Sequence, residues 1–124
     1  IVAQVAEVEK AEGGLRVRRV VCAIDCGTVI NPGQVARQME SAVIFGLSAA
    51  HFGRIDMRAG RVQQQNFPDY PMLTLADTPV IDTFFVDSEA PPGGVGEAGL
   101  PPIAPAVGNA WFALTGERKR SLPL

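Results

Sequence analysis

The chain has 124 residues, of which 47% are hydrophobic, and its formal net charge is −2. This composition excludes an intrinsically disordered chain, and the length suits one domain with a core of its own. A nucleic-acid partner normally shows as a basic stripe in the sequence, and this sequence has none. Because the sequence starts at Ile1, in what reads as a strand, we expect it to be a piece of a larger polypeptide.

Two segments near the start predict an antiparallel hairpin. Residues 1–9 alternate roughly between apolar and polar side chains, and residues 15–25 begin in the same way before becoming continuously apolar. The sequence Glu12-Gly-Gly between them supplies a turn. The continuous apolar run predicts that the far end of the second strand is buried on both faces.

A long helix is predicted next, over residues 34–52. Asn31-Pro-Gly is a turn signal before it, its apolar residues, among them Phe45, recur at helical spacing, and Gly53 marks its end. Gly46 would allow close packing against a sheet or another helix. A second hairpin is expected from residues 51–57 and 61–66, followed by an irregular segment at 67–71 and a strand at 79–87.

The most unusual segment is rich in glycine and proline. It reads Pro91-Pro-Gly-Gly-Val-Gly-Glu-Ala-Gly-Leu-Pro-Pro and contains a single carboxylate, Glu97. Glycine allows close backbone approach and proline stiffens the chain, so we expect a loop of defined shape. A helix should follow from Ile103, ending near Gly116. The residues alone leave two interpretations of Glu97, a catalytic base or an ordinary surface charge near a helix start.

The element order is therefore β-β-α-β-β-(β)-loop-α. It predicts an α+β fold in which a mostly antiparallel sheet packs against two helices, forming a single domain over residues 1–124. The two cysteines, Cys22 and Cys26, are expected to be buried thiols. A metal site would need more ligands than these and His51, the one histidine, can offer, so we expect no metal ligands.

Four motifs occur in an order that resembles one family. They are Asp25-Cys-Gly-Thr-Val-Ile-Asn-Pro, Gln38-Met-Glu-Ser-Ala-Val-Ile-Phe-Gly-Leu-Ser, Asn66-Phe-Pro-Asp-Tyr-Pro and Gly94-Val-Gly-Glu-Ala-Gly-Leu-Pro-Pro. Over essentially its whole length the chain is similar to the C-terminal end of the molybdopterin-binding large subunit of the xanthine oxidase family. Within that family it looks most like the isoquinoline 1-oxidoreductase β-subunit branch or a related aldehyde dehydrogenase. The resemblance implies a C-terminal fragment of a larger molybdopterin-binding subunit.

The resemblance also implies roles for individual residues. Glu97 would be the general base at the molybdenum centre, and burial in a dry, glycine-lined pocket would raise its pKa toward a useful range. Gln38 would hydrogen-bond the pterin of the molybdenum cofactor. Gly94, Val95 and Gly96 would bring the backbone close to the molybdenum ligands.

Two positions depart from the family pattern. Ser41 stands where the helix motif commonly has glycine, which adds a small side chain beside the expected cofactor site. Ala98 stands where proline is frequent. Neither substitution removes a chemical group that the expected roles require.

The implied activity is the oxidation of an N-heterocycle or an aldehyde with water as the oxygen source. The implied partners are the rest of the large subunit and an iron–sulfur small subunit that removes the electrons. The 124 residues alone should hold no cofactor, be inactive, and associate as a dimer through uncovered apolar surface. The compartment, cytoplasmic or periplasmic, stays open. The alternative is a non-catalytic structural or interaction domain that retains the fold.

Overall fold

The chain is seen in a computed structural model that describes residues 1–12 and 14–124, so Gly13 of the predicted turn lies outside the described residues. The elements follow the predicted order, which confirms the α+β class. They are β1 (Val2–Ala11), β2 (Gly14–Ile24), α1 (Pro32–Phe52), β3 (Met57–Arg58), β4 (Arg61–Val62), β5 (Val80–Phe85) and α2 (Ile103–Thr115), with two short 3-10 turns, Phe67–Asp69 and Leu75–Asp77.

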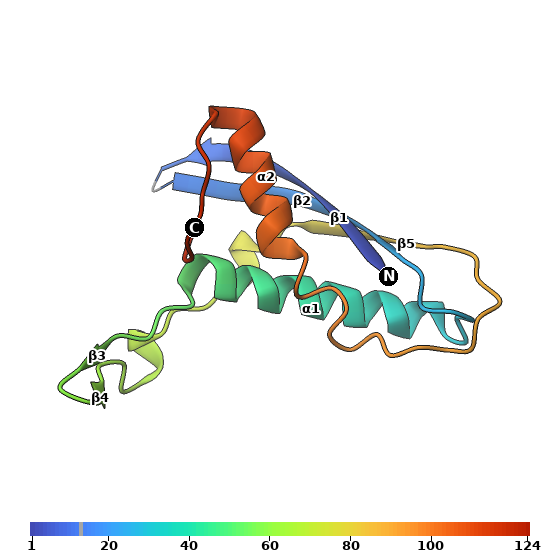
Figure 1. The fold of residues 1–124 in the computed structure, drawn as a ribbon, viewed down its shortest axis with the longest axis horizontal. Helices are drawn as coiled ribbons and strands as arrows, with labels where there is room; N and C mark the ends of the chain where they lie inside the picture. Colours follow the sequence, from blue (N-terminus) through green and yellow to red (C-terminus); the bar gives the residue numbers. More distant parts are fainter. Residues whose placement is uncertain (13) are drawn as a thin grey trace.

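The main sheet has three strands in the order β1-β2-β5. β1 and β2 form the predicted antiparallel hairpin, whereas β5 pairs parallel to β2. The second predicted hairpin is shorter than expected and does not join the main sheet. Its strands β3 and β4 form a two-stranded ribbon of their own that projects from the body (Figure 1). His51 and Phe52 belong to the last turn of α1, since the helix continues up to Gly53.

A β-bulge decides which side chains of β2 face the helices. The register shifts between Glu7 and Val8, so that Glu7 pairs with Arg19 but Val8 pairs with Val17. Arg18 is the extra residue. One extra residue reverses the alternation of faces, so Val17 before the bulge points to the same core as Val20, Cys22 and Ile24 beyond it.

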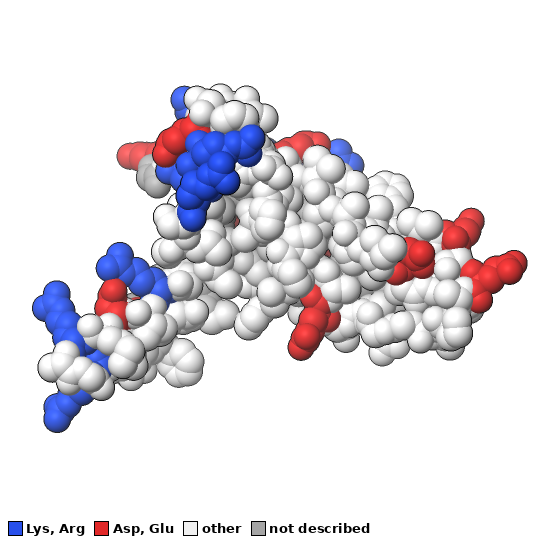
Figure 2. Space-filling model, viewed as in Figure 1, with Lys and Arg blue, Asp and Glu red and all other residues white. Residues whose placement is uncertain are grey.

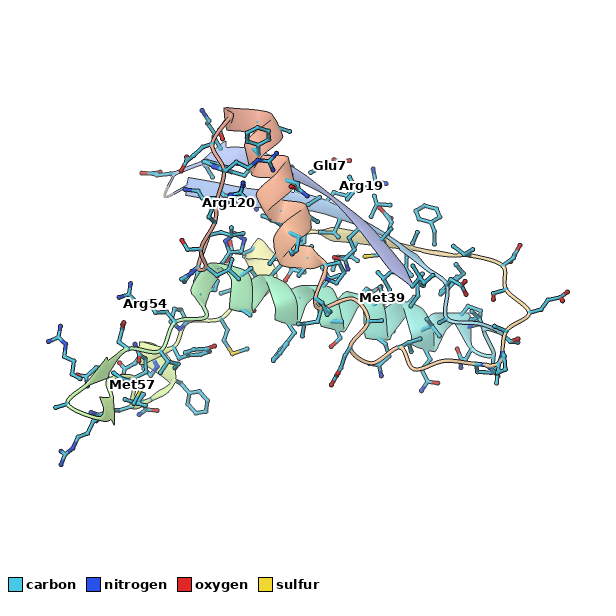
Figure 3. All side chains as sticks on the ribbon, in the orientation of Figure 1. Glu7, Arg19, Met39, Arg54, Met57 and Arg120 are labelled. Carbon is cyan, nitrogen blue, oxygen red and sulfur yellow. The ribbon has the colours of Figure 1, made fainter. Side chains whose placement is uncertain are left out.

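Both helices cover the same face of the main sheet. One cluster joins the buried residues of the strands to those of α1 and α2, and Met39 of α1 lies completely buried within it (Figure 3). The cluster contains Ala6, Val17, Val20, Cys22, Ile24, Met39, Val43, Leu47, Ile103 and Val107.

The opposite face of the sheet is left uncovered by the described residues. Val21 and Ala23 point there and are only half-buried, so the prediction that the end of β2 is buried on both faces is wrong for this chain. An ion pair crosses the same face, with Arg19 Nε 2.7 Å from Asp82 Oδ2. The end of β2 is apolar, as the sequence indicates, but both helices pack on the other face of the sheet.

Local signals set the helix ends, although α1 begins at Pro32 and not at the expected residue 34. The Asn31 side chain accepts a hydrogen bond from the Gln34 backbone N–H at the start of α1, with Pro32 in the first turn. α2 ends at Gly116, whose φ of 76° is the left-handed conformation that glycine adopts without strain. Across residues 1–12 and 14–124, neither helix combines the length and apolarity needed to cross a membrane.

Candidate functional site

The glycine-rich loop lies directly on α1. A Cβ added to Gly99 would be 3.1 Å from Met39 Cε and 3.2 Å from Ala42 Cβ, and one added to Gly46 would be 3.0 Å from the Leu100 carbonyl oxygen. Ordinary side-chain contacts are longer than these, so glycine on either side allows the loop to sit this close. The loop is therefore held against the middle of the helix. Gly46 also packs against another helix, as predicted, because an added Cβ would lie 2.5 Å from Ile103 Cγ2 of α2.

Two hydrogen bonds also fix the backbone around Glu97. The Gln4 Nε2 group of β1 donates to the Gly99 carbonyl oxygen at 2.8 Å, and the Leu100 N–H donates to the Glu97 carbonyl oxygen at 3.0 Å. The Glu97 side chain itself is exposed. Its backbone is thus anchored while its carboxylate is accessible, and the described residues alone do not form the dry pocket expected around it.

Glu97 lines a hollow of about 440 Å³, here named the Glu97 hollow. This volume lies in the range typical of small-molecule sites. Its lining residues are Ser41, Ala42, Phe45, Gly96, Glu97, Leu100 and Pro101. Phe45, which helical spacing assigns to the apolar face of α1, is instead 60% exposed at this hollow.

A second hollow, the Gln38 hollow, has a volume of about 290 Å³. Gln38 and Val95 both line it, so the structure brings together two of the residues singled out from the sequence. Gln38 and Ser41 are three apart on α1, which places the two hollows one turn from each other along the same side of the helix. The full lining is Cys26, Thr28, Val29, Ile30, Asn31, Gln34, Val35, Gln38, Pro92, Gly93 and Val95.

The wall of the Gln38 hollow is built from two loops that hydrogen-bond to each other. The Gly93 N–H donates to the Cys26 carbonyl oxygen at 2.8 Å, and the Thr28 N–H donates to the Ala90 carbonyl oxygen at 2.9 Å. Gly27 has a φ of 74°, and a Cβ there would overlap the Pro91 carbonyl. The first motif of the sequence therefore meets the segment that leads into the last motif at this wall.

The residues present fit a bound group such as a pterin with its metal. A Cβ added at Gly94 or Gly96 would meet no other atom of the described chain within 4 Å, so the space beside this backbone is free. The exposed Gln38 amide offers both donor and acceptor groups, which suit the polar edge of a pterin ring. Within the described residues, no three side chains of His, Cys, Asp or Glu gather as metal ligands.

The remaining candidates have structural contacts. Asp69 Oδ2 accepts hydrogen bonds from the Gln65 and Asn66 N–H groups and closes a capping turn. Tyr70, the next residue, is 39% exposed. Burial lowers the pKa of His51 at the end of α1 and raises the pKa of the Cys22 thiol.

The comparison with known protein families gives a clear result. Residues 1–79 match the family described as the molybdopterin cofactor-binding domain. Over 125 aligned residues the chain is 43% identical to the isoquinoline 1-oxidoreductase subunit beta of Brevundimonas diminuta. The alignment covers 99% of this chain and 16% of that protein. The chain is 36% identical, with the same coverage of both, to a membrane-bound aldehyde dehydrogenase [pyrroloquinoline-quinone] of Gluconacetobacter polyoxogenes.

A solved structure shares the fold. The crystal structure of the Cu,Mo-CO dehydrogenase in its carbon monoxide reduced state superposes with a TM-score of 0.74 and 27% identity, over 82% of this chain and 14% of that one. The chain thus spans only 16% of the length of the two curated relatives above.

Proposed function

The chain belongs to the molybdopterin cofactor-binding domains of the xanthine oxidase family, and we propose that it is a C-terminal part of a longer large subunit that oxidises an N-heterocycle or an aldehyde. Its similarity to an isoquinoline oxidoreductase and to an aldehyde dehydrogenase supports both substrate classes. The proposed partners are the rest of that subunit and an iron–sulfur subunit. The isolated 124 residues supply only one wall of the site and are expected to be inactive.

The observation that carries the proposal is the setting of Glu97. It is the single carboxylate that lines the Glu97 hollow. Its own carbonyl oxygen accepts the Leu100 N–H, and the neighbouring Gly99 is held by β1 and by α1. A general base must keep its position while its carboxylate reaches the proton that it removes. In the proposed reaction Glu97 accepts the proton of the water-derived nucleophile as it attacks the substrate carbon.

The cofactor contacts lie one helical turn away. We assign the pterin to the Gln38 hollow, where the Gln38 amide would hydrogen-bond its polar edge. Gly94, Val95 and Gly96 would present backbone to the metal end, because side chains larger than hydrogen at Gly94 and Gly96 would fill the open space beside them. When bound, the molybdenum cofactor supplies the oxidising centre that accepts the electrons of the substrate C–H bond.

The experiment is Glu97→Gln in the longer protein, which removes the basic oxygen while preserving the side chain's size. Loss of a positioned base should lower kcat by about two to four orders of magnitude. Molybdenum and pterin content should stay at the level of the unsubstituted protein. Glu89→Gln is the matched control, since Glu89 is an exposed carboxylate on the same loop but lines neither hollow.

An unchanged oxidation rate in a metal-loaded Glu97→Gln protein would remove the catalytic role. The non-catalytic structural domain would then be the better description of this chain. Loss of metal together with rate would instead mean that Glu97 supports cofactor binding, and the base assignment would fail.

A further inference from the structure

We propose that Gln4 of β1 is a positioning residue for Glu97. Its amide holds the Gly99 carbonyl oxygen and so fixes the loop backbone that carries the carboxylate. The inference rests on the proposed function, because it takes Glu97 as the base. It goes further by naming a residue at the other end of the chain on which the position of that base depends.

Gln4 is a polar residue in an apolar stripe of β1. Val2, Ala6 and Val8 alternate with exposed side chains along the strand and lie in the core or pack against it. Gln4 belongs to the same stripe, where an amide is unfavourable unless it is hydrogen-bonded. It finds a partner outside the sheet, since Gln4 Nε2 lies 2.8 Å from the carbonyl oxygen of the buried Gly99. The strand is thereby tied directly to the glycine-rich loop.

The loop around Glu97 has few other ties. On its N-terminal side the nearest one is at Gly93, whose N–H donates to another loop at 2.8 Å. Across the described residues, the backbone from 94 to 98 makes one further hydrogen bond, which closes a turn within the loop itself. Glycines at two of these positions leave the stretch conformationally free. The hydrogen bond from Gln4 to Gly99 therefore limits how far the Glu97 backbone can move.

This hydrogen bond adds little to the stability of the fold. The Gln4 Oε1 atom, at the other side of the same amide, is buried and accepts no hydrogen bond from the described residues, which is unfavourable. Exchange of Gln4 for Met, which has a similar length, removes this unsatisfied oxygen but leaves the Gly99 carbonyl without its donor. Because the two effects oppose each other, Gln4→Met separates the position of Glu97 from the stability of the chain.

The first test measures motion of the loop in the ¹⁵N-labelled 124-residue chain by NMR relaxation. The amide order parameters of Glu97 and Gly99 should be those of rigid backbone, about 0.85, and should fall toward about 0.6 in Gln4→Met. The urea midpoint should change little. Val20→Ala is the control, because Val20 is a completely buried residue of β2 that lines neither hollow. It should lower the midpoint by leaving a cavity and keep the order parameters unchanged.

The second test uses the cofactor-loaded longer protein. A misplacement of about 1 Å at a reacting group can lower a rate by about 100-fold, so Gln4→Met should lower kcat by about 10- to 100-fold. KM should change by less than about 3-fold, since no contact with substrate is removed. Molybdenum and pterin content should stay at the level of the unsubstituted protein. Val20→Ala should keep both kcat and KM.

A rigid loop in Gln4→Met, an unchanged kcat despite a mobile loop, or an equal loss of kcat in Val20→Ala would each overturn the inference. The relaxation measurement needs no cofactor, so its result is independent of Glu97→Gln. A rigid loop in Gln4→Met together with an inactive Glu97→Gln protein would reject the role of Gln4 and keep the proposed function. A mobile loop together with a fully active, metal-loaded Glu97→Gln protein would reject the proposed function and leave Gln4 as a tie of the loop without a base to position.

Discussion

Two glycines show how residue-scale constraints differ at nearly the same backbone angle. Gly27 and Gly116 have φ values of 74° and 76°, but only Gly27 faces the Pro91 carbonyl at close range. We predict that Gly116→Ala costs about 1–2 kcal/mol of unfolding free energy, from the left-handed backbone alone. Gly27→Ala should cost about 1–3 kcal/mol more, because overpacking adds to the same strain.

Urea denaturation of the two variants measures this difference. Equal losses would contradict the close contact between the loop at Gly27 and the loop at Pro91. That contact forms the wall of the Gln38 hollow, so the measurement also tests the proposed cofactor site.

Cys22 and Cys26 should differ in reactivity. Burial in the core raises the pKa of the Cys22 thiol, with a hydrogen bond to Gln4 acting weakly in the opposite direction, so little reactive thiolate forms. Cys26 is only partly buried. With iodoacetamide at pH 8, mass spectrometry should find Cys26 modified first and Cys22 modified only after denaturant is added. Equal modification rates in the folded chain would contradict the buried position of Cys22.

At the scale of elements, α1 and α2 meet through a glycine that cannot be enlarged. Gly46→Ala would place a Cβ 2.5 Å from Ile103 Cγ2, and we predict a loss of about 1–3 kcal/mol of unfolding free energy from overpacking. Gly108→Ala in α2 meets nothing within 4 Å and should stabilise the chain by about 0.5–1 kcal/mol through helix propensity. Chemical denaturation of both variants measures these changes. A stabilising Gly46→Ala would contradict the close contact between Gly46 and Ile103.

The last turn of α1 should make stability depend on pH. Burial lowers the pKa of His51 in the folded chain, so the folded state binds fewer protons than the unfolded state. Its contribution is complete above the ordinary value of about 6.5 and is lost as the pH falls through the lowered value. We expect the unfolding free energy to drop between pH 7.5 and 5.5, and less so in His51→Leu. An identical slope in the variant would exclude this cause.

Local patterns explain why so many elements could be predicted. Asn31 and Pro32 start α1, Gly53 and Gly116 end the two helices, and strand alternation defines the first hairpin. Three features depend on distant contacts and have no local signal. These are the parallel pairing of β5 with β2, the bulge at Arg18 and the exposure of Tyr70.

The candidate site residues come from the sequence motifs, whereas their arrangement comes from the structure. The motifs identify Gln38 and Glu97, but only the packing of the loop on α1 shows that they line two adjacent hollows. The exposure of Phe45 at the Glu97 hollow was not predicted, because a helix with a wide apolar stripe gives no sign of which apolar residue lies at its edge.

At the scale of the whole molecule, the uncovered sheet face should drive association. Val5 and Phe84 are 65% and 58% exposed there, next to the half-buried Val21 and Ala23. Figure 2 looks onto the side of the molecule that carries α2, and it shows charged side chains gathered at the ribbon, at the C-terminal tail and at the opposite end. An apolar sheet face of this kind favours association with a second surface.

We predict that the isolated chain forms a dimer in light scattering and that Phe84→Glu shifts it toward monomer. The substitution places a charge on the apolar face, on its edge strand β5, without touching the core. A monomeric mass for the unsubstituted chain at high concentration would contradict the prediction.

The most direct test of the central claim is the cofactor content of the longer protein, purified with its partner subunit from a host that makes the molybdenum cofactor. Elemental analysis should find close to one molybdenum per large subunit, and fluorescence after oxidation should find matching pterin. One relative carries pyrroloquinoline quinone in its name, so quinone should be measured in the same sample. Quinone in place of pterin, or neither metal nor pterin, would contradict the account and leave Glu97 without a centre to serve.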